Sequence, residues 1–374
     1  MIDRIREEAR QRFAELGYPT THDEEWRFTS VAPIARTNFE PSGAGPRPAA
    51  GSQPAHISKL SEASVEPYLA RYASYQNNAF VALNTANFED GLFIHIPRGA
   101  VIEEPIEIVI QSSANGHPTV SHPRILIVAE PGSQATIIEK YEGVASSPYF
   151  TNSVTELIAG DNAVIDHYKL QTESDRAFHV ATLQVQLGRD TNFRSHSLSF
   201  GGALVRNDVT AVLSEGSECT LNGLYLVNGG QHIDNHTTID HAKPHAASHE
   251  LYKGILDGKS SAVFNGKILV RKDAQKTDAK QTNKNLVLSE ESVINTKPEL
   301  QIHADDVRCT HGATIGQLDA EGIFYLQSRG IGRVEARNLL IVAFARDIVD
   351  RIKVAPLRDR LEMLLLEKLH GSRN

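Results

Sequence analysis

The chain has 374 residues, of which 40% are hydrophobic and 22% are charged. This composition is typical of a folded globular protein and excludes a disordered chain, which would have fewer apolar residues. Aspartate and glutamate number 46 against 38 lysines and arginines, and the net charge of −8 supplies no general attraction to phosphate backbones or anionic lipids. We therefore expect neither a nucleic acid nor a membrane as a partner.

The N-terminus and the cysteine content indicate the cellular location of the protein and limit the metal sites that it can form. The opening residues MIDRIREE include acidic side chains and lack the apolar run of a signal peptide, and no later segment approaches the roughly 18 apolar residues that span a bilayer. We expect a cytoplasmic protein. Only two cysteines are present, Cys219 and Cys309, too few for a disulfide framework or a four-thiolate metal site. Any metal bound here needs other ligands or another chain.

The N-terminal part is expected to be helical. Apolar residues at spacings of three and four predict an amphipathic helix over residues 2–16, which Gly17 and Pro19 end. The segment 40–54 is rich in Pro, Gly, Ala and Ser and predicts a flexible linker. We assign residues 1–75 to an N-terminal helical region that includes this linker.

Residues 76–317 are expected to form a β-rich core. Short β-type runs alternate with turns, and four turn glycines recur at intervals of 28 residues, at 132, 160, 188 and 216. Small and then large apolar residues follow them at fixed offsets and are predicted to stack in two columns: Ala135, Ala163, Thr191 and Cys219, and Ile137, Ile165, Phe193 and Leu221. The period favours a parallel β-helix over a β-sandwich, whose turns recur every 8 to 12 residues or so.

Residues 318–374 are expected to form a small helical domain. Asp319 is a suitable cap for a short helix that Gly330 ends, a longer helix follows from about Val334 to Ile348, and Pro356 begins a final leucine-rich set of turns. Isolated helices of this size are marginal in water. Their apolar faces must therefore dock on the core or on another protein.

Two local patterns suggest ligand sites that the residues do not support. The run from Gly254 to Ser260 has three residues between its glycines where a P-loop has four, so we interpret it as a strand turn and expect no ATP binding. Five histidines precede this run at spacings of four or five, but Pro244 interrupts any helix that would align them on one face. We interpret them as hydrogen-bonding or interface residues: His232, His236, His241, His245 and His249.

Cys309-Thr310-His311 is the sharpest chemical feature. On a strand, Cys309 and His311 point to the same face and offer a sulfur and an imidazole together. Two ligands do not close a metal site, so a second chain would have to complete it, while His303, Asp305 and Asp306 could tune it. No catalytic triad or pair of carboxylates stands out, and we do not expect an enzyme.

Several segments carry a family resemblance. The C-terminal half of the SufB/SufD family of iron–sulfur cluster assembly proteins resembles this chain over Phe264–Val270, Ala274–Leu286, Lys297–Ile302, Ala304–Gly316 and Phe324–Ile331. The N-terminal segments Pro19–Thr29 and Gly91–Pro97 resemble the family too. The form Asp-Val-x-Cys-x-His-Gly-Ala-Thr is similar to the SufD branch, whereas the SufB branch has His-Glu-Ala there and further cysteines.

The resemblance implies a mainly β fold: a right-handed parallel β-helix flanked by N- and C-terminal helical domains. It implies a non-catalytic scaffold subunit that pairs with SufB and is held by two copies of the ATPase SufC. Cys309 and His311 would then lie at the SufB interface, where an iron–sulfur cluster or iron is held transiently and no cofactor permanently. Our candidate SufC-docking residues are Phe324, Tyr325, Arg329, Gly330, Ile331 and Phe344.

Four alternatives stay open at this point. The chain could build a cluster with its own ligands, as a SufB-like scaffold does, or do so as a homodimer. It could also be an adaptor that only recruits the ATPase. A different class, a β-helical carbohydrate-active enzyme, shares the fold type alone.

Overall fold

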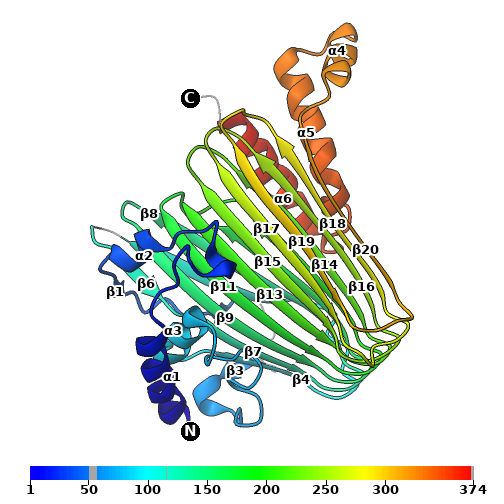
Figure 1. Cartoon of the computed structure of the whole chain (residues 1–374). Helices are drawn as coiled ribbons and strands as arrows, with labels where there is room; N and C mark the ends of the chain where they lie inside the picture. Colours follow the sequence, from blue (N-terminus) through cyan, green and yellow to red (C-terminus); the bar gives the residue numbers. More distant parts are fainter. Residues whose placement is uncertain (50–56, 115, 372–374) are drawn as a thin grey trace.

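The fold is a parallel β-solenoid made of two sheets (Figure 1). The computed structural model describes residues 1–49, 57–114 and 116–371. From β8 onward, consecutive strands alternate between the sheets, and each pairs in parallel with the strand one coil earlier. The predicted parallel β-helix is confirmed and the sandwich is excluded, because neighbours in a sandwich sheet are mainly antiparallel.

The first sheet runs in the order β3 (Ile57–Lys59), β4 (Leu92–Ile96), β7 (Arg124–Ala129), β9 (Tyr149–Ala159), β11 (Ala177–Leu187), β13 (Leu204–Leu213), β15 (His232–His241), β17 (Ser261–Val270) and β19 (Val293–Ile302). Two short strands extend it beside β9: β6 (Thr119–Ser121) pairs with β9, and β1 (Glu40–Pro41) pairs with β6. The second sheet runs in the order β2 (Arg47–Pro48), β5 (Ile106–Ala114), β8 (Gln134–Ala145), β10 (Val164–Thr172), β12 (Asn192–Ser199), β14 (Glu218–Val227), β16 (Ala247–Leu256), β18 (Asp278–Val287) and β20 (Arg308–Gly316). The facing sides of the two sheets enclose a packed lumen.

The register differs from the one that the glycine spacing predicts. Ile165 lies opposite Phe193 as expected, but Ala135 lies opposite Ile165, and Phe193 lies opposite Cys219. The predicted columns are therefore wrong by two residues at two of their steps. A shift of two keeps a side chain on the same face of its strand, so the apolar residues of both columns still pack together in the lumen core.

The turn conformation explains the error. In the turns that lead from the first sheet into the second, one residue takes a left-handed backbone conformation in each coil up to β18, and its N–H donates to a carbonyl of the next coil at 2.7–3.2 Å. This position holds Gly132 and Gly216, but Asn162 and Asp190 in the coils between them. Asn and Asp tolerate that conformation. Gly160 and Gly188 precede it by two residues, so the spacing of glycines is not the register of the coils.

The N-terminal elements cover the outer face of the first sheet. The predicted helix is confirmed as α1 (Ile2–Leu16), followed by η1 (Glu24–Trp26), α2 (Ala32–Arg36), η3 (Leu60–Glu62) and α3 (Ala79–Asn87). The β-rich core expected over residues 76–317 also contains a helix, because α3 occupies residues 79–87 and β4 begins the solenoid at Leu92. Asn78 caps α3, and residues 80–86 are all buried, so the apolar run carried no helical period.

The expected linker is partly anchored to the solenoid. Within 40–54, the strand β1 pairs with β6, and β2 pairs with β5 in antiparallel orientation. Residues 50–56 lie outside the described residues. The division at 75 and 317 remains a prediction.

The C-terminal helices cover the outer face of the second sheet. They are α4 (Ala320–Ser328), α5 (Arg333–Val349) and α6 (Ala355–Gly371), so the leucine-rich turns expected after Pro356 form a complete helix. Ile341, Ile348 and Leu361 pack on outward residues of the sheet such as Leu198 and Leu224. Figure 1 shows α4 extending beyond the last coils, and α4 has no buried residue. No helix within the described residues is long and apolar enough to cross a membrane.

Candidate functional site

The last coil leaves one end of the solenoid open. The strands β19 and β20 end their sheets, and no strand of the described residues pairs with their outer edges. Every residue of β20 except Cys309 is exposed, and Val293, Ile302 and Ile315 are large apolar side chains exposed there. Unpaired strand edges with apolar side chains are sites where another chain can add a strand or pack.

Cys309 and His311 lie together on this last strand. Cys309 is opposite Ala279, and His311 is opposite Gln281, both of which are buried residues. The pair therefore continues the lumen-facing side of the second sheet and becomes accessible at the open end. Cys309 is half-buried, and burial followed by the negative charge of Asp278 raises the pKa of its thiol. Among the described residues, no group of three or more His, Cys, Asp or Glu could hold a metal ion.

No sequence pattern predicts the carboxyl group that lies behind His311. The register places Glu250, Gln281 and His311 opposite one another on three successive strands. Gln281 Nε2 donates to Glu250 Oε2 at 2.7 Å, and both side chains are buried. Burial raises the pKa of Glu250 to about 7. A group that titrates near neutrality thus lies two strands behind the open end, and only the coil register could have revealed it.

The residues upstream of Cys309 shape the turn into β20. Asp306 forms an ion pair with Lys276 of the previous coil, while His303 and Asp305 are exposed. These side chains lie in the loop between β19 and β20. Their predicted role in tuning a site on Cys309 stays a prediction.

The five spaced histidines do not form one group. His236 lies between Asp234 and Glu25, with nitrogen–oxygen distances of 3.0 Å and 3.2 Å. Burial disfavours a positive charge on its ring, but the two carboxylates favour that charge more strongly. The pKa of His236 therefore rises to about 9. The others separate along the coil: His232 bonds Ser261, His241 bonds Ser248, His245 is a left-handed turn residue and His249 is exposed. The strand geometry therefore separates the rings, and most of them make hydrogen bonds within the solenoid.

The P-loop-like run is a strand and its turn, as interpreted. Gly254 lies within β16, where a Cβ atom would come 2.4 Å from the ring of Tyr225. Gly258 has φ +65° in the following turn. Close packing thus requires the first glycine, and the left-handed backbone favours the second. Neither lies at the start of a helix, as a P-loop requires.

A buried charged cluster lies in the lumen near β8 to β11. His167 Nε2 is 3.1 Å from Glu139 Oε1, and His179 Nδ1 is 2.7 Å from Glu173 Oε2. Burial lowers the pKa of Lys169 to about 8 despite these carboxylates. The cluster pairs its charges internally, which is how buried charges persist. Its members come from separate coils, so the sequence alone did not bring them together.

The candidate docking residues separate into two groups. Phe324 and Tyr325 on α4 are 74% and 57% exposed, and the guanidinium of Arg329 lies 5.2 Å from the ring of Tyr325. Gly330 follows α4 with φ +85°, and Ile331 is half-buried. Phe344 differs, because its ring packs on the second sheet with the ammonium of Lys253 at 4.4 Å. Among the candidate docking residues, the exposed apolar side chains thus lie on α4, whereas Phe344 of α5 packs on the sheet.

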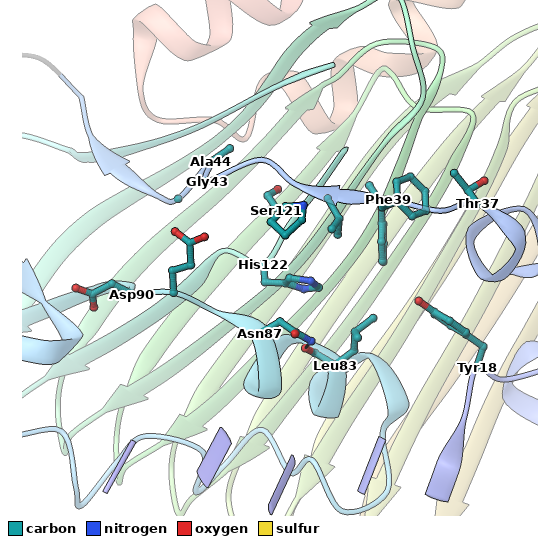
Figure 2. A pocket seen from close by; sticks show the side chains of 15 residues that line it. Tyr18, Thr37, Phe39, Gly43, Ala44, Leu83, Asn87, Asp90, Ser121 and His122 are labelled. Atoms are coloured by element: carbon teal, nitrogen blue, oxygen red, sulfur yellow. Dashed lines mark hydrogen bonds between the residues drawn. The ribbon is translucent and has the colours of Figure 1, made fainter. Parts of the chain in front are cut away.

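A cavity of about 370 Å³ lies at the other end of the solenoid, between the N-terminal segment and the first sheet. Figure 2 shows the His122 ring between Leu83 and Asn87 on one side and Ser121 on the other. Burial lowers the pKa of His122 to about 4, so its ring is neutral at pH 7. The cavity shares no residue with the Cys309 and His311 end, and we assign it no part in that site.

Comparison with known proteins identifies the family. A model of the SufBD core domain, described as SUF system FeS cluster assembly, matches residues 109–344, and a model of the SufBD N-terminal region matches residues 51–108. The chain belongs to the SufBD family. The matched core of this SufBD protein includes β20 and α4, so both candidate surfaces lie within family-matched sequence.

Individual relatives agree with this assignment. The SufBD protein is 35% identical over 401 aligned residues to an iron–sulfur cluster assembly SufBD family protein of Synechocystis, which covers 95% of this chain and 88% of the relative. It is 32% identical to the iron–sulfur cluster assembly protein SufD of Escherichia coli, over 79% of this chain and 71% of that protein. SufD of Bacillus subtilis is 28% identical over 77% of this chain and 66% of its own length. The chain is therefore a SufD-like member of the SUF iron–sulfur assembly system.

Proposed function

We propose that this chain is the SufD-type, non-catalytic scaffold subunit of a cytoplasmic SUF complex. It pairs through the β19 and β20 end with a SufB-type subunit, and Cys309 and His311 face the site where an iron–sulfur cluster, the cargo of the system, is assembled. The observation that carries the proposal is the open last coil, with this pair at its exposed end. The same open end would pair two copies of this chain in a homodimer when the chain is isolated.

The donor set favours shared and transient ligation. Thiolate and imidazole are good ligands for iron, but a cluster with four protein ligands needs two more than this end supplies. The raised pKa of Cys309 keeps its thiol protonated until iron or a positive partner group lowers it. The isolated chain is therefore expected to bind no cluster permanently.

The geometry disfavours a chain that builds a cluster with its own thiolates. Cys219 is buried in the lumen, and it belongs to the same register column as Cys309 through Ser248 and Ala279. Three strand spacings separate the two sulfur-bearing residues, about 14 Å along the sheet. They cannot bind one small cluster together.

The exposed face of α4 is the proposed docking surface for the ATPase SufC. Phe324 and Tyr325 expose aromatic surface on a helix that has no buried residue. Aromatic residues are enriched at the centres of protein interfaces. Nucleotide hydrolysis in a docked ATPase would move the C-terminal helices and bias the arrangement of the two scaffold subunits.

Co-purification with the SufB and SufC homologues from the same source tests these roles separately. His311→Ala and Cys309→Ser are expected to leave the complex intact and to reduce cluster formation, whereas a Phe324→Ser/Tyr325→Ser double variant is expected to lose the ATPase. Point variants are preferable to truncation after Gly316, because α5 and α6 cover apolar residues of the second sheet.

His22→Ala is the matched control, an exposed histidine between α1 and η1 that lies outside the strands of the solenoid. It should leave both complex and cluster formation unchanged. The interface-site proposal fails if His311→Ala and His22→Ala assemble clusters equally well. An adaptor role alone would then remain for the chain.

A further inference from the structure

A basic pocket lies on the outer face of the second sheet, where the end of α5 meets β14, β16 and β18. Its volume is about 290 Å³. Strands and helix together contribute four basic side chains to its lining: His249, Lys280, Lys284 and Arg351. The pocket shares no side chain with the α4 face or with Cys309 and His311.

The strand register brings basic side chains together in this pocket. His249 lies directly opposite Lys280, and Lys253 lies directly opposite Lys284. Directly opposed ammonium groups, such as those of Lys253 and Lys284, destabilise a sheet unless an anion lies between or beside them. Within the described residues, no carboxylate lies within 4 Å of Lys280, Lys284 or the guanidinium of Arg351.

Two acidic residues line the pocket, Glu250 and Asp347, and both have partners. The Glu250 side chain is buried and accepts from Gln281 Nε2 at 2.7 Å. Lys253 is also buried, and its ammonium is 2.5 Å from Asp347 Oδ2 and donates to the carbonyl of Phe344 at 2.8 Å. The hydrogen bond from Lys253, followed by the charges of Lys284 and Arg351, lowers the pKa of Asp347. Burial, followed by the same two charges, lowers the pKa of Lys253. The pocket is thus locally positive in a chain whose net charge is −8.

The floor of the pocket contains a buried polar group with unused capacity. Asn222 is 2% exposed, and its Nδ2 lies 3.2 Å from His196 Nε2. Its Oδ1 has no hydrogen-bond partner among the described residues. A half-turn of this amide would let His196 donate to the oxygen and would free the N–H groups for an anion.

We propose that this pocket binds a phosphate group, carried by free pyrophosphate or by a nucleotide. Ammonium and guanidinium groups on several sides of a small recess suit a tetrahedral anion with several oxygen acceptors better than a single carboxylate. Such an anion removes the repulsion between the opposed cations. The proposal does not depend on the role of Cys309 and His311.

Titration calorimetry of the full chain at low salt, with pyrophosphate and separately with ADP, tests the site. Lys280→Gln/Lys284→Gln is expected to weaken binding about tenfold or more, since each lost ion pair costs roughly 0.5–1 kcal/mol or more. The matched control is Lys243→Gln/Lys272→Gln, which removes the same charge from exposed turn lysines of neighbouring coils. It should change the affinity less than about twofold.

Saturable binding of either probe would establish that the pocket binds phosphate. The relative affinities of the two probes identify the source of the phosphate. Tighter binding of ADP assigns a nucleotide, and equal or tighter binding of pyrophosphate assigns the free anion. The proposal is overturned if the wild-type chain shows no saturable binding of either probe, or if both double variants weaken binding equally. Circular dichroism of the two variants checks that each remains folded.

Discussion

The two ends of the solenoid are built in opposite ways. At the first coil, β3 pairs with β4 and β2 pairs with β5, both in antiparallel orientation, so each sheet edge is covered. At the last coil, β19 and β20 have no such partner among the described residues. A chain that covers one pair of edges and leaves the other uncovered directs association to a single end. The difference supports the proposed position of the partner subunit.

The ion pairs at the two ends also differ in burial. At the covered end, Arg124 and Glu156 form an ion pair with both side chains fully buried. Glu156 also accepts backbone N–H groups of Ala70, Tyr72 and Ala73 at 2.9–3.0 Å, which ties the N-terminal segment to β9. At the open end, the pair of Lys276 and Asp306 is exposed. Buried charge thus fixes the covering segment, and exposed charge leaves the other end adaptable.

Arg124→Met should have the largest effect on stability. It removes the cation from a buried carboxylate and leaves that charge uncompensated, which costs about 3–5 kcal/mol. Urea denaturation followed by circular dichroism should show a correspondingly lower midpoint. Lys297→Met breaks the exposed pair with Glu24 and should cost about 1 kcal/mol or less. Equal losses in the two variants would contradict the contrast between buried and exposed pairs.

The second prediction concerns the link between η1 and the first sheet. His236 faces Asp234 on its own strand, Glu25 on η1 and Arg206 on β13. Its pKa of about 9 lies above the unfolded value of about 6.5, so its contribution is fully present below pH 6.5 or so and is lost as the pH rises through 9. The contribution amounts to about 2–3 kcal/mol at neutral pH.

Stability of wild type and His236→Gln should therefore be compared between pH 6 and pH 10. The difference in the free energy of unfolding should be largest at the acidic end and shrink through pH 9. The control His22→Gln changes an exposed histidine outside the solenoid strands and should change the free energy of unfolding by less than about 0.5 kcal/mol. A constant difference across this range would mean that His236 does not carry the charge assigned to it.

Much of the fold was accessible from the sequence. The helix α1, the caps of α4 and the coiled β architecture follow from periodicity and turn residues, which act locally. The register was not accessible, because the left-handed turn position holds Asn162 and Asp190 as well as glycine. The helix α3 was missed because complete burial removes the apolar period that distinguishes a helix from a strand.

The candidate site was accessible only in part. Cys309 and His311 share a face because strand alternation is local, and the structure places both on β20. Glu250 and the basic pocket depend on which residues of different coils lie opposite one another, and a register error of two residues conceals both. The exposed face of α4 was expected. Phe344 was expected there too, but it packs inward, because this side of α5 covers the apolar outer face of the second sheet.

The smallest effect is expected at the open end. Ile315 is 55% exposed, so Ile315→Thr, which keeps the β-branched shape, should change the free energy of unfolding by less than about 0.5 kcal/mol. The same substitution at Ile268, which is fully buried in β17, removes buried apolar surface and introduces a hydroxyl, and should cost about 2 kcal/mol or more. Both are measured by urea denaturation of the isolated chain. A large loss for Ile315→Thr would mean that this end is already covered in solution, by a second copy of the chain, and a dependence of the midpoint on protein concentration would then identify that copy.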